Sequence, residues 1–318
     1  MPVHLPPART KREGAERPAE SLRHYPWPMA LYRLTEPPEP LVAPALVAAF
    51  DGWVDASGAS TAAASIIAGD GETIAIFDPD ALYDYRSRRP VLDIVDGIPN
   101  DLIWPGLAVK RVRHEGRDLL VLTGPEPDFR WRELGVDILD MCLRLGVVEW
   151  MSLGAIPAAV PHTRPVRILA TASKPGLLHE DEQQGPGGLL RVPAAALSTL
   201  EVAVSGGGIP AVGFYAQVPH YVGGPYVEAT IALLEHAGRH LGVTFSLGSL
   251  PDEATAERQR LDQAVATDED SRTYVERLER MVGDERIPSG DEIAAEIERF
   301  LRAQPGSGEG GRTPLGGP

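Results

Sequence analysis

The sequence is poor in the residues that build disulfides, membrane spans and anion sites. Among 318 residues there are one cysteine, Cys142, and three lysines, and aromatic residues make up only 6%. A single cysteine cannot form an internal disulfide, which is typical of a reducing compartment, so we expect a cytoplasmic protein. No apolar run approaches the roughly 18 residues of a membrane-spanning helix. We therefore expect no membrane partner.

Positive charge is also scarce. Thirty Lys and Arg residues stand against 45 Asp and Glu residues, which gives a formal net charge of -15 at pH 7. The phosphates of nucleic acids repel an acidic protein that has no basic stripe, so we expect no nucleic-acid partner. Residues 251–303 hold 15 Asp or Glu, eight Arg and no Lys. This stretch is either a solvated helical surface or a docking face for a basic partner.

Short apolar runs alternate with amphipathic segments along most of the chain. The apolar runs predict strands at 41–50, 73–77, 107–123 (a hairpin), 147–154, 166–171 and 209–216. The segments between them predict helices at 57–68, 130–145, 193–205 and 225–241. Cys142 falls on the apolar face of the second helix, so we expect it in the core. Alternating strands and helices predict an α/β sandwich around a mostly parallel sheet.

Composition divides the chain into four parts. The first 28 residues hold six prolines and five Lys or Arg, so we expect a disordered arm at 1–28. The strands and helices predict an α/β core domain over 29–250. The charged helical pattern predicts an acidic helical appendage over 251–303. The last 15 residues include six Gly and three Pro, which predicts a disordered tail at 304–318.

The first strong strand leads into an unusual stretch, LVAAFDGWVDASGASTAAASIIAG at 46–69. Its glycines have the spacing of a P-loop, but alanine stands where the phosphate-binding lysine belongs. No Gly-x-Ser-x-Gly surrounds its serines, which argues against a nucleophile elbow. We interpret the stretch as a packing joint, in which a helix of small residues approaches the sheet or a neighbouring subunit closely. Asp55 or Ser57 is placed to cap its first turn.

Three polar loops follow strands of the predicted sheet, at 51–57, 156–165 and 217–226. Ligands of α/β proteins bind at the carboxyl ends of the strands, so these loops predict a pocket or an interface there. Its candidate residues are Asp51, Trp53, Asp55, His162, Thr163, Arg164, His220 and Tyr221. They suit an acid–base site or a purine pocket, but the histidines also suit rigid, hydrogen-bonded turns.

Metal and cofactor signals are weak. No His-x-x-x-His, Glu-x-x-His or paired-cysteine spacing supplies a compact ligand set. Within the long polar loop 174–188, three adjacent carboxylates at 180–182 point in different directions and are expected to face water. We therefore expect no metal site and no cofactor.

Four segments taken together resemble the proteasome assembly chaperone 2 family in its actinobacterial form. They are VAAFDGWVDASGAS, SLGAIPAAVPHTRP, GPGGL and GIPAVGFYAQVPHYVGGPY, and the resemblance covers roughly residues 30–285. It implies a three-layer α/β/α sandwich similar to the nucleoside phosphorylase and hydrolase folds. It also implies assembly with copies of the same chain, a trimer being one form. Eukaryotic members act as chaperones for proteasome α subunits, so a proteasome-related protein is the implied partner.

Three functions follow in order of preference. The first is a non-enzymatic assembly or scaffold protein that acts as a homo-oligomer, because no complete catalytic set is found. The second is a nucleoside phosphorylase-like or hydrolase-like enzyme, with Trp53 or Tyr221 stacking a base and Asp55 or His220 moving a proton. In this second function Arg164 is the candidate for an anion contact. The third, an ATP-dependent carboxylate–amine ligase, lacks the cations that hold phosphates.

Overall fold

The computed structural model describes residues 30–35, 39–180, 182, 185 and 188–283. Three predicted parts lie wholly or partly outside these residues: the disordered N-terminal stretch at 1–28, the tail at 304–318 and the last part of the appendage. Most predicted strands and helices are present within a few residues of their expected bounds. In the described residues, no helix combines the length and the apolar character needed to cross a bilayer.

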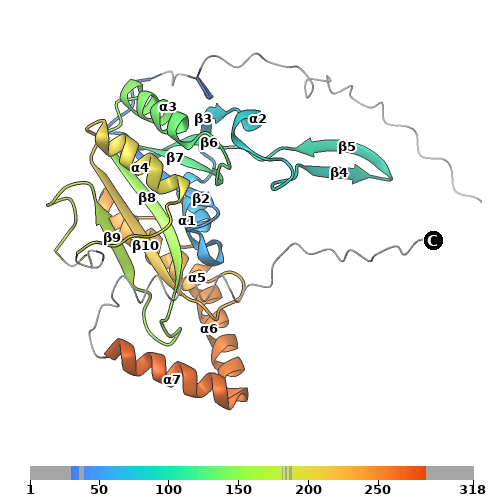
Figure 1. The fold of residues 1–318 in the computed structure, drawn as a ribbon, viewed down its shortest axis with the longest axis vertical. Helices are drawn as coiled ribbons and strands as arrows, with labels where there is room; N and C mark the ends of the chain where they lie inside the picture. The colour runs from blue at the N-terminus through green and yellow to red at the C-terminus, as the bar shows by residue number, and fades with distance from the viewer. Residues whose placement is uncertain (1–29, 36–38, 181, 183–184, 186–187, 284–318) are drawn as a thin grey trace, which may run out of the picture.

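The centre of the molecule is a mixed eight-stranded sheet with the strand order β1-β3-β6-β7-β2-β8-β10-β9 (Figure 1). Its strands are β1 (Tyr32–Leu34), β2 (Ala45–Asp51), β3 (Glu72–Phe77), β6 (Ala108–His114), β7 (Arg117–Pro125), β8 (Glu149–Ala158), β9 (Ile168–Ala172) and β10 (Ala211–Pro219). The four strands β7, β2, β8 and β10 run parallel, and the other pairings are antiparallel.

The prediction of a mostly parallel sheet is therefore wrong. A parallel crossover needs a long connection, usually a helix, and two parts of this chain lack one. The predicted hairpin pairs β6 with β7 through a tight turn at Glu115 and Gly116, which both have positive φ. No helix separates β8 from β9, and β9 pairs antiparallel with β10. Alternating apolar runs do not show which strands become neighbours.

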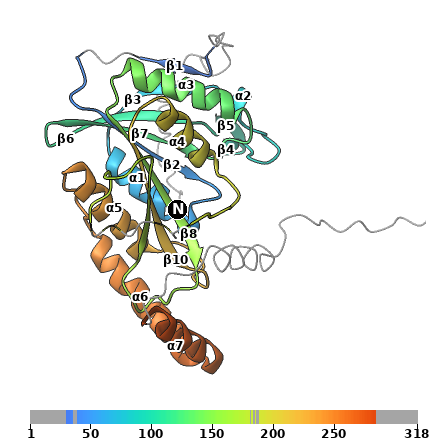
Figure 2. The same cartoon turned by 60° about the vertical axis from the view of Figure 1, so that its left-hand side comes forward.

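Helices cover both faces of the sheet, as predicted for a sandwich (Figures 1 and 2). The helices are α1 (Ala59–Ala68), α2 (Pro79–Leu82), α3 (Trp131–Arg144), α4 (Ala196–Gly206), α5 (Val227–Leu241), α6 (Leu250–Thr267) and α7 (Glu269–Gly283). Buried residues of α3 and α4 pack on one face, and those of α1 and α5 pack on the other. Cys142 is fully buried among the first group, and burial raises the pKa of its thiol to about 12. Its predicted place in the core is confirmed.

Helix α1 is the predicted packing joint. Ser60, Ala63 and Ala64 are fully buried, and the two alanines belong to the buried cluster that includes residues of the sheet and of α5. The hydroxyl of Thr230 on α5 donates to the carbonyl of Ala59 over 3.4 Å. The small residues of α1 thus let two helices and the sheet approach one another. Ala62 faces solvent, so only one side of the helix has this role.

A two-stranded arm projects from the sheet and was not predicted (Figure 1). Strands β4 (Val91–Val95) and β5 (Ile98–Ile103) pair with each other, and every residue of both strands is exposed. Asp96 and Gly97 form the turn, both with positive φ, as a two-residue hairpin turn requires. The Asp-Gly pair between two apolar runs is the sequence signal for this hairpin. We call residues 91–103 the arm.

The helices α6 and α7 extend beyond the sheet, at the bottom of Figure 1. Helix α6 packs against α5, and the two appendage helices pack against each other, with Val275 and Leu278 of α7 buried. Asp262 of α6 and Tyr274 of α7 contact His162 and His220, so both helices lie beside the loops that leave the carboxyl ends of β8 and β10.

Candidate functional site

A cleft of about 1330 Å³ lies at the carboxyl ends of β2, β8 and β10. This is the edge at which the sequence predicts a pocket. Parts of all three predicted loops line it, together with the segment that precedes α4. Of the eight predicted site residues, the cleft is lined by Trp53, Asp55, His220 and Tyr221.

The sequence predicts Asp55 or Ser57 as the cap of helix α1, and Asp55 is the one that caps it. Its Oδ1 accepts hydrogen bonds from the backbone amide and the hydroxyl of Ser60, at 2.8 and 2.6 Å. The same oxygen accepts from the amide of Thr61 at 3.2 Å, and Oδ2 accepts from the Thr61 hydroxyl at 2.5 Å. Both carboxylate oxygens are therefore engaged at the positive end of the helix. This geometry supports a structural role for Asp55 rather than proton transfer.

The turn that carries Trp53 is held by a carboxylate that the sequence analysis missed. Glu126 accepts from the Trp53 amide at 3.0 Å through Oε2 and from the Ala196 amide at 2.7 Å through Oε1. It thereby ties the turn after β2 to the start of α4. The Trp53 side chain is 40% exposed, so an aromatic surface is available at the cleft. Asp51 lies next to this turn and pairs with Arg88 at 3.5 Å.

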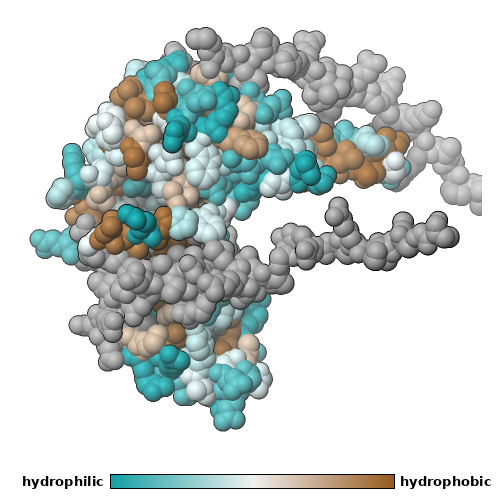
Figure 3. Space-filling view, viewed as in Figure 1, coloured by the Kyte–Doolittle hydropathy of each residue, from teal (hydrophilic) through white to brown (hydrophobic). Residues whose placement is uncertain are grey.

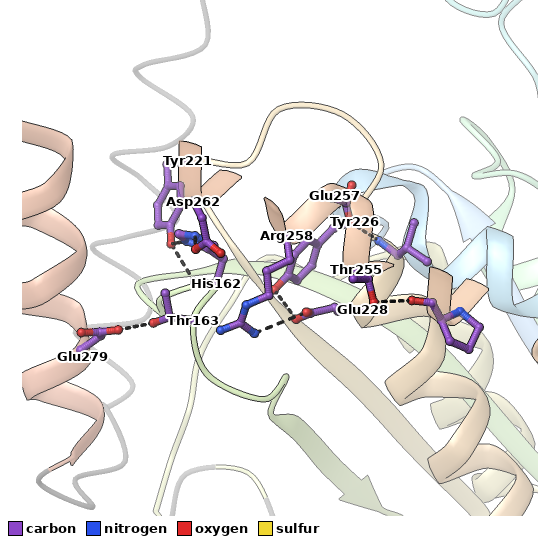
Figure 4. A network of polar contacts seen from close by, with 12 residues as sticks. His162, Thr163, Tyr221, Tyr226, Glu228, Thr255, Glu257, Arg258, Asp262 and Glu279 are labelled. Carbon is purple, nitrogen blue, oxygen red and sulfur yellow. Dashed lines mark hydrogen bonds and ion pairs between the residues drawn. The ribbon is translucent and has the colours of Figure 1, made fainter. Parts of the chain in front are cut away.

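His162 does not line the cleft. It lies against Asp262 of helix α6 (Figure 4). Its side chain is 1% exposed, its Nδ1 lies 2.8 Å from the Tyr221 hydroxyl, and its Nε2 lies 3.1 Å from Asp262 of α6. The Tyr221 hydroxyl also accepts from the His162 amide at 2.8 Å. Thr163 donates to Glu279 of α7. The loop 156–165 is thus fastened to both appendage helices.

His220 is also occupied on both ring nitrogens. Its Nδ1 lies 3.1 Å from the carbonyl of Ala158, and its Nε2 lies 3.1 Å from the hydroxyl of Tyr274 on α7. Burial raises the pKa of its neighbour Tyr221 to about 12. These contacts hold the loops 156–165 and 217–226 in a fixed relation and match the rigid-turn alternative.

Arg164 does not supply the expected anion contact, because it is exposed and outside the cleft lining. Among the described lining residues, the cation is Arg88, which the sequence analysis did not name. The guanidinium of Arg88 also donates to the Asp51 carbonyl at 3.1 Å. Its pairing with Asp51 offsets part of the positive charge that an anionic ligand would meet.

A second polar group joins Ser152 and Glu201 to Thr171, which lines the cleft, and it was also missed. Ser152 on β8 accepts from the indole N–H of Trp150 at 2.8 Å and donates to Glu201 of α4 at 2.7 Å. Thr171 donates to the other Glu201 oxygen at 3.4 Å. Burial raises the pKa of Glu201 above its usual range, and the hydroxyl donors oppose that rise. A carboxyl group in this environment holds its proton to higher pH than one in water.

The ring of Tyr215 fills the space beside Glu201. A Cβ atom on Gly154 would lie 2.4 Å from this ring, and one on Gly213 would lie 2.8 Å from it. Glycine at these two strand positions therefore lets the ring lie flat on the sheet. Burial, with Glu201 nearby, raises the pKa of the Tyr215 phenol. The wall of the cleft is consequently built from neutral or hydrogen-bonded groups.

These contacts depend on partners that are far apart in the sequence. His162 meets Asp262, Thr163 meets Glu279, and Ser152 meets Glu201 from a different layer of the fold. Sequence spacing carries no signal for such pairs. Across the described residues, the cleft holds no group of three metal-ligating side chains; one such group lies at the other edge of the sheet.

Comparisons with known proteins place this geometry in a family. The sequence model of the PAC2 family matches residues 49–265. None of the curated proteins compared with the chain matches it. A proteasome-assembly chaperone homologue of Mycobacterium tuberculosis is 36% identical, covers 73% of this chain and 99% of its own, and superposes with a TM-score of 0.67.

Two further solved structures extend the comparison. A PAC2 family protein from Streptomyces avermitilis is 34% identical, covers 73% of this chain and 99% of its own, and has a TM-score of 0.66. An archaeal proteasome activator from Pyrococcus furiosus is 17% identical, with a TM-score of 0.55, and covers 73% of this chain and 97% of its own. The archaeal likeness shows the fold alone.

Proposed function

The chain belongs to the PAC2 family, and from that premise we propose that it is a non-enzymatic assembly or scaffold protein that acts as a homo-oligomer. Relatives are described as a proteasome-assembly chaperone homologue and as a proteasome activator, so a proteasome-related protein is the proposed partner. The cleft contacts are consistent with this role. Asp55 and His220, the groups proposed for proton transfer, are both held in structural hydrogen bonds.

The arm is the observation that carries the proposal. Its exposed apolar residues include Val91, Ile94, Val95, Ile98 and Ile103, which are 54–68% exposed. Figure 3 shows them as a brown patch on the projection to the right of the molecule. An isolated two-stranded hairpin is at best marginally stable in water, and exposed apolar surface of this kind is typical of a protein contact. We infer that the arm is ordered by contact with another subunit.

A second copy of this chain is the occupant that the charges favour. Asp93 and Asp101 face each other across the arm, and like charges in such a pair destabilise a hairpin. Arg86 and Arg89, at the base of the arm, are exposed. Two arms packed in opposite directions, each reaching past the base of the other, would place the basic base of one against the acidic middle of the other. Such self-complementarity is what a two-fold contact between identical chains requires.

The proposal is tested by measuring the mass of the particle in solution. We expect the wild-type chain to form an oligomer in light scattering after gel filtration, and the double variant I94E/I98E to be smaller, because two charges would be buried in the contact. The matched control is V136E/V202E, which adds the same charges at exposed apolar positions of α3 and α4. A wild-type monomer at high concentration, or an unchanged mass for I94E/I98E, would overturn the proposal.

The phosphorylase-like or hydrolase-like alternative keeps one favourable observation, the cleft with an exposed Trp53 and Arg88 in its wall. We propose to test it with a panel of nucleosides and nucleotides, with and without phosphate, read by base release. On the assembly proposal no base is released. Release that disappears in W53A/R88A would establish the alternative, whatever the oligomeric state.

A further inference from the structure

A cluster of three potential metal ligands lies at the amino-terminal edge of the sheet, away from the cleft. His179 and Glu182 come from the segment after β9, and His240 comes from the last turn of α5. One ligand atom of each residue lies within 4.8 Å of the others. Two of the three ligands are thus on one turn of chain, and the third is on a helix packed against the sheet.

Two atoms of this cluster are buried without a hydrogen-bond partner in the described part of the chain. They are Oε1 of Glu182 and Nδ1 of His240. The Glu182 residue is only 7% exposed, and the His240 side chain only 9%. A buried carboxylate oxygen without a partner is unfavourable, and buried polar atoms in folded proteins are nearly always satisfied. The arrangement therefore lacks a group that both atoms would bind.

The other atoms of these side chains are already held in place. Oε2 of Glu182 accepts from the His179 amide at 2.8 Å, which orients the carboxylate. Nε2 of His240 lies 3.4 Å from Oε2 of Glu149, and Glu149 also pairs with Arg117. Metal-binding histidines commonly donate their second ring N–H to a carboxylate in this way. Each orienting contact leaves the unpartnered atom as the one available for a ligand.

We propose that His179, Glu182 and His240 bind a divalent transition-metal cation of the Zn²⁺ class. Two imidazole nitrogens and one carboxylate oxygen are a ligand set of zinc sites, with ligand distances of about 2.0–2.2 Å and a fourth position for water. Tetrahedral ligand atoms are roughly 3.4 Å apart, so small side-chain adjustments of His179 and Glu182 would complete the site. The proposal opposes the expectation of no metal, and it does not depend on the assembly role.

The chemistry of the cluster favours a cation over the other ligands of a polar site. A carboxylate oxygen and neutral imidazole nitrogens all present lone pairs, which repel an anion. Nitrogen donors select Zn²⁺ and its neighbours over Mg²⁺ and Ca²⁺, which prefer oxygen donors. A bound cation also compensates the carboxylate of Glu182 in its buried position.

Binding would fasten the segment after β9 to α5. Further along the chain, the amide of Gly185 donates to the Ala170 carbonyl at 2.9 Å, and Gly185, Leu190 and Val192 line the cleft. The metal therefore anchors one end of a segment whose other end shapes the cleft. We expect the anchored segment to unfold with the core rather than separately.

The test uses the untagged full-length chain, stripped with a chelator and then dialysed against Zn²⁺. We expect about one Zn²⁺ per chain by elemental analysis, and a melting temperature about 5–10 °C higher at a hundredfold excess over Kd. Co²⁺ serves as a spectroscopic probe, because nitrogen ligands in a tetrahedral site give intense visible absorption. Zn²⁺ below about 0.1 per chain, with no change in melting temperature, would overturn the proposal.

Matched variants distinguish this site from nonspecific binding. E182Q and H240Q remove ligands and are expected to lower the Zn²⁺ affinity at least tenfold and to abolish the Co²⁺ spectrum. E180Q changes an exposed carboxylate two residues from Glu182, and H236Q changes the histidine one turn before His240. Both controls are expected to bind as the wild type does. Equal binding by E182Q and E180Q would also overturn the proposal, even if E182Q is less stable.

Discussion

Polar side chains at the carboxyl edge and at the amino edge of the central sheet differ in whether all their polar atoms have hydrogen-bond partners. At the carboxyl edge, the carboxylate of Asp55 and the ring nitrogens of His162 and His220 all have hydrogen-bond partners. At the amino edge, Glu182 and His240 each keep one buried atom without a partner among the described residues. A satisfied polar group positions the chain, whereas an unsatisfied buried one indicates a missing ligand. The edge with the large cleft is therefore not the edge that most needs a ligand.

Replacing Asp55 gives the largest expected effect, because its carboxylate accepts four hydrogen bonds at the start of α1. We predict that D55A lowers the free energy of unfolding by about 2–3 kcal/mol, measured by urea denaturation. D70A removes an exposed carboxylate just beyond the same helix and should stay within about 0.5 kcal/mol of wild type. A D55A variant as stable as wild type would mean that the hydrogen bonds of Asp55 do not stabilise the carboxyl edge. That result would contradict the contrast drawn between the two edges.

Enlarging α1 on its buried side tests the same edge by packing. Ala63 is fully buried and Ala62 is exposed, so the two neighbours form a matched pair. We predict that A63L costs about 1–3 kcal/mol, because a dense interface cannot take up the added volume, and that A62L is nearly neutral. Thermal melts of both variants give the answer. Equal melting temperatures would contradict the packing joint.

Glu201 tests whether a satisfied carboxyl at the cleft is held neutral. Its raised pKa means that the folded chain keeps a proton that the unfolded chain has released. Its contribution to stability is therefore fully present below the unfolded pKa and is lost as the pH rises through the higher folded pKa. Glutamine cannot ionise, so we predict that E201Q becomes more stable relative to wild type as the pH rises above the usual range of a glutamate carboxyl. The matched control is E235Q, which makes the same substitution at an exposed position, and both variants are measured by denaturation curves across the same pH range.

The smallest effect is expected at the amino edge in the absence of metal. E182Q removes a carboxylate oxygen that has no partner, so we predict a free energy of unfolding within about 0.5 kcal/mol of the metal-free wild type. E149Q disturbs a carboxylate that pairs with Arg117 and His240 and should cost about 1–3 kcal/mol. If E182Q were the more damaging of the two in chelator-treated protein, the unpartnered oxygen would have an unrecognised structural role.

Local pattern was enough to predict most of the elements of the core. Helix α3, predicted at 130–145, spans Trp131–Arg144, because its apolar residues repeat with helical spacing. The loops at the cleft were predicted because parallel strands end at one edge. The arm was missed, since its strands are exposed on both sides and show no buried face, and the mixed strand directions depend on pairing across the chain.

The candidate site was predicted less well than the fold. The loop at 156–165 was placed at the correct edge, but α6 and α7 bind His162 and Thr163 from more than 90 residues away along the chain and remove them from the cleft. Such distant partners also determine the roles of Glu126, Glu201 and the His179–Glu182–His240 cluster. The residue types in a loop therefore predict which side chains lie near the cleft. They do not predict which of these side chains remain available to bind a ligand.

Core packing and partner contact usually place requirements on the same residues. The residues of the arm are not needed for packing the core. The strands of the arm pair with each other and with no other strand of the described sheet, so a substitution in 91–103 leaves the packing of the core unchanged. If the arm contacts the partner as proposed, mutations that alter partner choice can accumulate in it without first being screened for their effect on folding. Related chains can diverge in what they assemble with while inheriting the same core.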